Sequence, residues 1–159
     1  MKPNKLPAGY WRNPVHLTAC GFGSGAAAYA PGTWGTLVGI PFYIAMSGLN
    51  WPLYLLICVV MYFLGVWLCG QTAKDFNVHD HPGIVWDEVV GYLITMIAVP
   101  FEWHWVVLGF ILFRIFDIAK PWPIKVIDKR VDGGTGIMLD DVLAGLLALS
   151  IMHIIIKFL

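Results

Sequence analysis

Charged side chains are scarce in this 159-residue chain: Asp, Glu, Lys and Arg together make up 13% of it, about half the share usual in soluble domains. Ten basic residues balance ten acidic ones, so the chain lacks the basic excess of a nucleic-acid-binding protein. With 58% hydrophobic residues it also lacks the composition of a disordered protein. Its cysteines, Cys20, Cys58 and Cys69, are odd in number and lie in apolar sequence, which argues against a disulfide scaffold. The length predicts one domain, residues 1–159, and the composition favours a membrane protein.

The apolar residues form long stretches. Residues 13–73, 89–101, 103–113 and 142–156 contain no Asp, Glu, Lys or Arg. Residues 51–70 are the clearest candidate for a membrane-spanning helix, 141–159 are a second, and 36–49 form a shorter one. Residues 89–100 and 103–116 are predicted to be the two arms of a helical hairpin that turns at residues 100–102. The predicted fold is all-α, a polytopic helical membrane bundle.

Lys and Arg indicate how such a bundle is oriented. They precede the first apolar stretch and gather between residues 114 and 130, whereas the turns at residues 48–51 and 100–105 contain none. By the positive-inside rule the charged blocks are cytoplasmic. The outer turns carry Trp51, Trp103 and Trp105, which suit an interfacial aromatic belt. We therefore expect any polar site at the cytoplasmic face.

The charged blocks contain an internal repeat. Residues 75–94 read DFNVHDHPGIVWDEVVGYLI and residues 128–147 read DKRVDGGTGIMLDDVLAGLL. Aligned without gaps at an offset of 53, both show an Asp, a glycine-containing turn, an acidic pair and an apolar helix. The pairs are Asp87–Glu88 and Asp140–Asp141. The sequence thus predicts two acidic turn–helix units related by a pseudo-twofold axis.

The acidic pairs allow several interpretations. Carboxylates at the start of a helix stabilise its N-terminus, which alone would explain one pair. If the two units pack together, four carboxylates converge, and they repel one another unless they are protonated or bridged by a cation. Oxygen ligands without Cys favour Mg²⁺, Mn²⁺ or Ca²⁺ over zinc. Paired acidic groups could equally line a cation pathway.

Cations and glycines lie near these pairs. Arg114, Asp117 and Lys120 recur every three residues on a helix expected to end before Pro121; the cations could bind phosphate or simply pair with Asp117. The glycine-rich residues 21–36, which include Gly32 and Thr33, could bring backbone N–H groups to a phosphate or serve close helix packing. The run His79–Asp80–His81 places a candidate general acid beside the first pair, although a surface turn explains it as well.

Five segments in order, GFGSG, PGTWGT, HDHPGIVWDEVVG, RIFDIAKPWPI and DKRVDGGTGIMLDDVLAG, closely resemble the phosphatidylglycerophosphatase A family over nearly the whole chain. The resemblance implies a Mg²⁺-dependent phosphatase, multi-pass in the bacterial inner (cytoplasmic) membrane, with its active site on the cytoplasmic side. Its expected substrate is phosphatidylglycerophosphate, which loses its terminal phosphate to give phosphatidylglycerol.

This resemblance, joined to the residue pattern, leads to a set of expected roles. Asp87, Glu88, Asp140 and Asp141 hold one or two Mg²⁺, or Mn²⁺ in its place. Arg114 and Lys120 neutralise the phosphate oxygens, and Gly32 and Thr33 contact the substrate. The expected catalytic set contains Asp80, Asp87, Asp117 and Asp140, with Asp80 or Asp117 as the acid or base. Asp75, Asp128 and His79 are expected to support the site. Two alternatives stay open: a covalent aspartyl-phosphate route, and a small non-enzymatic membrane protein whose acidic pairs bind or transport a cation.

Overall fold

The computed structural model describes residues 5–158, apart from the side chains of Asp128 and Lys129. All regular secondary structure in these residues is helical, which confirms the predicted all-α class. Two short 3₁₀ helices lie near the N-terminus, η1 (Tyr10–Arg12) and η2 (Gly21–Ala26). The α-helices are α1 (Pro14–Ala19), α2 (Pro31–Met46), α3 (Trp51–Asp75), α4 (Trp86–Thr95), α5 (Trp103–Ala119), α6 (Ile124–Arg130) and α7 (Gly133–Phe158).

Two of the predicted boundaries are confirmed by recognisable start and stop signals. Helix α3 begins at Trp51, where the Asn50 side chain accepts a hydrogen bond of 3.1 Å from the Leu53 N–H and Pro52 occupies the first turn, both typical of a helix N-terminus. The predicted hairpin is present, with α4 packed on α5, but its first arm ends at Thr95, five residues before the predicted end at residue 100. Helix α5 ends before Pro121, because Lys120 leaves the helix with φ of 41°.

Two other helices begin earlier than the sequence predicts. Helix α7 begins at Gly133, so the expected glycine turn is helical and Asp140 and Asp141 lie about two turns inside the helix. A Cβ on Gly134 would overlap Val66 O and lie 2.9 Å from Gly70 N on α3; this glycine serves close helix packing, not a turn. Helix α2 likewise begins at Pro31, which places Gly32 and Thr33 in its first turn.

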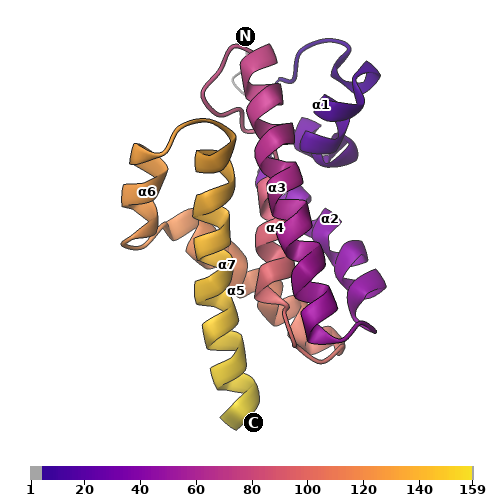
Figure 1. Cartoon of the computed structure of the whole chain (residues 1–159), viewed down its shortest axis with the longest axis vertical. Coiled ribbons are helices and arrows are strands. Elements are labelled where there is room, and N and C mark those ends of the chain that lie inside the picture. The colour runs from indigo at the N-terminus through magenta and orange to yellow at the C-terminus, as the bar shows by residue number, and fades with distance from the viewer. Residues whose placement is uncertain (1–4, 159) are drawn as a thin grey trace.

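The long helices α3 and α7 run side by side in opposite directions, and α4 packs against both (Figure 1). Helix α7 also contacts α5 and α6, and α2 covers α4. Three buried tyrosines join the helices: the Tyr43, Tyr54 and Tyr92 hydroxyls donate to the carbonyl oxygens of Val99 (3.0 Å), Leu93 (2.9 Å) and Val106 (3.3 Å). These bonds satisfy the phenol groups within an otherwise apolar core.

Among the described residues, α3 and α7 are the two helices long and apolar enough to cross a membrane. Helix α3 exposes large apolar side chains along its length, including Leu56, Val60, Phe63 and Trp67. Helices α2, α4 and α5 have 16, 10 and 17 residues, fewer than the roughly 20 that span a hydrocarbon core. The multi-pass arrangement therefore stays a prediction.

Candidate metal and phosphate site

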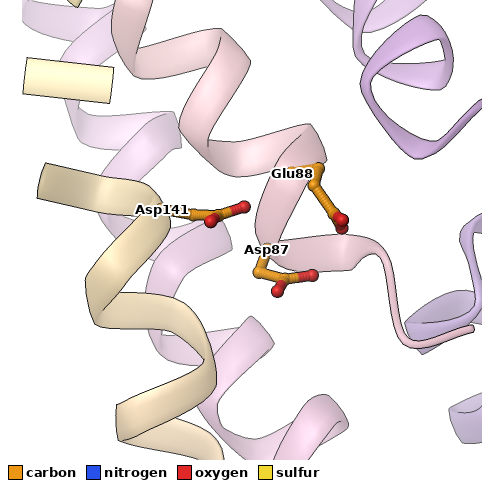
Figure 2. Close-up of side chains that lie close together, drawn as sticks. All are labelled: Asp87, Glu88 and Asp141. Carbon is orange, nitrogen blue, oxygen red and sulfur yellow. The ribbon is translucent and has the colours of Figure 1, made fainter. Parts of the chain in front are cut away.

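Three carboxylates converge where α4 meets α7. Asp87 and Glu88 occupy the first turn of α4, and Asp141 reaches toward them from α7 (Figure 2). One oxygen from each of the three lies within 4.8 Å of the other two. Glycines allow this approach: a Cβ on Gly145 would lie 2.5 Å from Gly91 O, and a Cβ on Gly91 would lie 2.9 Å from Asp141 O. The α4–α7 contact is therefore close enough for a side chain as short as Asp to bridge it.

The cluster is largely buried, with Asp87 and Glu88 partly exposed, and it is incompletely hydrogen-bonded. Asp141 is 2% exposed, and among the described residues Asp87 Oδ1, Glu88 Oε2 and Asp141 Oδ2 are buried without a hydrogen-bond partner. Asp87 and Glu88 lie outside the two candidate membrane helices. Burial, and secondly the charge of Glu88, raises the pKa of Asp87; burial, and secondly the charge of Asp141, raises the pKa of Glu88. Three bare anions are unfavourable here, so the cluster requires protons or a cation.

Asp140 does not join these three carboxylates. Successive residues of a helix point about 100° apart, so Asp140 points away from the direction of Asp141. Its Oδ2 accepts a hydrogen bond of 2.6 Å from Lys120 Nζ. Lys120 follows the end of α5 in a left-handed conformation, so its side chain extends to α7 instead of continuing the expected row with Arg114 and Asp117. The expected set of four ligands is thus divided into a cluster of three and a neighbouring ion pair.

Arg114 connects the cluster to α5. Its Nη1 donates to Asp117 Oδ2, the expected intrahelical pair, and lies 4.0 Å from Glu88 Oε1. Both the Arg114 and the Asp117 side chains are largely buried, at 14% and 13% exposed. Within the described residues Arg114 Nε is buried without an acceptor. This arginine therefore retains an unused donor at the edge of the acidic cluster.

The first turn of α2 closes another side of the site. A Cβ on Gly32 would come well under 3.0 Å from Glu88 Oε1, and 3.1 Å from Arg114 Nη1. Gly32 is therefore required for space beside the functional side chains. The Thr33 N–H donates to Ala30 O at 2.9 Å, so it is engaged within the turn and is not available to a phosphate.

The remaining predicted residues lie in separate places. Asp75 contacts His16 Nε2 and Gln71 Nε2, both at 2.8 Å, which places it at the α1–α3 junction and outside the cluster of three. Asp80 is exposed in the loop before α4, close enough for its charge to act on Asp87. The Asp128 side chain lies outside the described part of the structure.

His79 Nε2 lies 2.7 Å from Asp132 Oδ1, between two exposed side chains. These two residues occupy equivalent positions of the aligned segments, as do Glu88 and Asp141. Two equivalent pairs of the sequence repeat thus face each other, although the helix starts of the two segments differ.

Sequence reasoning missed the Gly91–Gly145 contact, which sets the α4–α7 separation. A glycine within each apolar helix, in the sequences VVGYL and LAGLL, is the signal that could have indicated it.

Fold and site together define an all-helical protein with two candidate membrane helices and a buried carboxylate cluster flanked by Arg and Lys. Residues 17–156 match the family model described as Phosphatidylglycerophosphatase A. The chain is 51% identical over 144 residues to phosphatidylglycerophosphatase A of Escherichia coli, covering 90% of this chain and 84% of that one. The Haemophilus influenzae protein of the same name is 47% identical over 145 residues, covering 90% and 89%. The chain belongs to the phosphatidylglycerophosphatase A family.

A more distant relative carries a different name. It is a Bacteroides thetaiotaomicron protein provisionally named a phosphatidylinositol-3-phosphatase, 39% identical over 138 residues, covering 81% of this chain and 85% of that one. No solved structure matches the chain.

Proposed function

We propose that this protein hydrolyses the terminal phosphomonoester of phosphatidylglycerophosphate, giving phosphatidylglycerol and phosphate in phospholipid biosynthesis. The names of two relatives at 51% and 47% identity support this substrate. The structural observation that carries the proposal is the convergence of Asp87, Glu88 and Asp141 beside Arg114. A phosphatase needs opposite charges for a phosphate and for a cation within one site, and these residues supply both.

The residues fit a hard divalent cation, Mg²⁺ or alternatively Mn²⁺. Asp87, Glu88 and Asp141 would hold it, because each has a buried oxygen that the described protein leaves without a hydrogen bond and because oxygen-only ligand sets suit these ions. When bound, such an ion supplies polarisation of the phosphate and neutralises its charge. Mg²⁺ binds few protein ligands and keeps several waters, so three carboxylates form a sufficient set.

The protein's own side chains then have distinct roles in hydrolysis. Arg114 binds the phosphate oxygens, and Asp117 holds the guanidinium in place. A water oxygen attacks phosphorus and gives up a proton, the ester P–O bond breaks, and the departing lipid oxygen takes up a proton from solvent. Asp80, the exposed carboxyl beside Asp87, accepts the proton of the attacking water. The Lys120–Asp140 pair supports the site from α7.

We place the protein in the bacterial inner membrane with this site on the cytoplasmic side. Helix α7, at 26 residues, is about 39 Å long, longer than the roughly 30 Å hydrocarbon core. The difference of about 9 Å lets roughly the first six residues of α7 stand outside the apolar layer, which places Asp140 and Asp141 near its edge. That depth suits a substrate whose phosphate lies in the headgroup region.

The direct test is phosphate release by the purified protein from phosphatidylglycerophosphate in mixed micelles, with Mg²⁺, with Mn²⁺ and with chelator. We expect release that depends on the divalent ion and is lost in Asp87→Asn. The matched control is Glu102→Gln, an exposed carboxylate at the α4–α5 turn, which should keep activity. Cation binding without phosphate release under any ion would instead favour the non-enzymatic alternative.

The same assay distinguishes the two chemical routes. Direct attack by water leaves no phosphate on the protein after acid quenching during turnover. An acid-stable phosphoprotein that disappears in one Asp→Asn variant would show the covalent aspartyl-phosphate route.

A further inference from the structure

A largely apolar pocket with two cationic side chains in its lining lies on α6, separate from the carboxylate cluster. It has a volume of about 340 Å³ and is lined by Trp122, Lys125, Val126 and Arg130; we call it the α6 pocket. Helix α6 packs along the first half of α7 (Figure 1). None of the roles assigned above uses these four residues.

The pocket combines two cations with exposed apolar surface. Lys125 and Arg130 are exposed, and within the part of the chain that the structure describes neither forms an ion pair. Trp122 is 82% exposed, so most of its indole surface is open to the surroundings of the protein. Val126 is partly buried and adds an apolar wall to the pocket. Cations beside Trp are typical of protein surfaces that meet the lipid headgroup region.

The position of the pocket agrees with this chemistry. Helix α6 begins four residues after Lys120, whose ammonium bonds to Asp140 at the site. It is followed directly by α7, a candidate membrane helix. The pocket therefore lies at the charged end of an apolar helix, where a lipid would present its phosphodiester to Lys125 and Arg130 and its glycerol and upper chains to Trp122 and Val126.

We propose that the α6 pocket binds the phosphodiester headgroup of an anionic phospholipid. The inference does not depend on the phosphatase activity, because a phosphodiester lipid has no terminal phosphate to lose. Inorganic phosphate offers an anionic phosphate group without the glycerol and acyl groups, so it separates recognition of a lipid from recognition of a free anion.

The test is calorimetric titration of the full-length protein in neutral detergent. The probes are short-chain phosphatidylglycerol, short-chain phosphatidylcholine and inorganic phosphate. The test variant is Lys125→Gln/Arg130→Gln, and the matched control is Lys74→Gln/Lys157→Gln, which removes the same charge from exposed positions at the ends of α3 and α7. A cation near an anionic lipid surface contributes about fivefold in affinity, so we expect roughly a thirtyfold loss for phosphatidylglycerol in the test variant.

The outcome is judged by comparing the affinities of the variants for each of the three probes. The proposal is supported if phosphatidylglycerol affinity falls in the test variant and not in the control, and if Trp122→Ala also weakens it. Equal losses in both double variants would show general charge attraction and overturn the pocket. Inorganic phosphate binding as tightly as the lipid, with the same loss, would overturn the lipid assignment. Unchanged affinity in the test variant would also overturn it. Phosphate release is measured separately on the same variants, so a failed phosphatase assay leaves this test intact.

Discussion

Substituting Gly32 by alanine tests the geometry of the site with a single methyl group. Gly32 contributes no side chain to chemistry, yet its added Cβ would sit well under 3.0 Å from Glu88 Oε1, 3.2 Å from Glu88 Cδ and 3.1 Å from Arg114 Nη1. The Glu88 carboxylate has to retreat by about 1 Å to restore ordinary van der Waals contact. A displacement of that size at a reacting centre can cost roughly 10²-fold in rate.

The fold should tolerate the change, because the atoms that must move belong to the end of a flexible side chain and not to the backbone. We therefore expect Gly32→Ala to lose on the order of 10²-fold in kcat/KM on phosphatidylglycerophosphate with little change in Tm by circular dichroism. Gly48→Ala is the matched control, because a Cβ there meets nothing within 4 Å. Glu88→Gln should cost less in the Gly32→Ala background than in the wild type, since the carboxylate is already displaced. Normal turnover in Gly32→Ala would refute the placement of Glu88 in the reactive site.

Four further predictions concern the cluster and its support. Asp87→Asn and Asp141→Asn should each reduce kcat/KM by about 10²-fold or more, with Asp140→Asn less severe; equal effects would return Asp140 to the ligand set. Arg114→Ala should lower turnover while the Mg²⁺ concentration for half-maximal rate stays constant, and a shift confined to that concentration would contradict its phosphate role. Gly134→Ala should destabilise the fold by about 1–3 kcal/mol, lowering Tm by several degrees; an unchanged Tm would show that α3 and α7 are not in close contact there. Chelation should abolish phosphate release and Mg²⁺ should restore it; release that persists in chelator would exclude a divalent-ion requirement.

The sequence predicts the elements whose boundaries depend on local signals. Asn50 and Pro52 begin α3, and Pro121 limits α5, because caps and proline act within one or two turns. The charge-free runs likewise predict that α3 and α7 are apolar, since a long stretch without charged residues favours a hydrocarbon environment by its composition alone.

The parts of the site that could not be predicted depend on contacts between distant segments. Gly134 has the same sequence signature as a turn glycine, and only the approach of Val66 on α3 shows that it is a packing glycine. Asp140 and Asp141 are equivalent by sequence, and which face of α7 packs against α4 decides which one joins the cluster. Lys120 turns toward α7 because α5 ends one residue before it, a boundary that a three-residue spacing does not reveal.

The glycine contacts on α7 also limit how its length can vary. Gly134 is held against α3 and Gly145 against α4, and Asp140 and Asp141 lie between them. Inserting or deleting one residue in this interval would rotate the carboxylates by about 100° relative to at least one of the two contacts. Active members of the family should therefore differ in residue type along this segment but keep its length of eleven residues after Gly134 unchanged, with insertions and deletions confined to the loops.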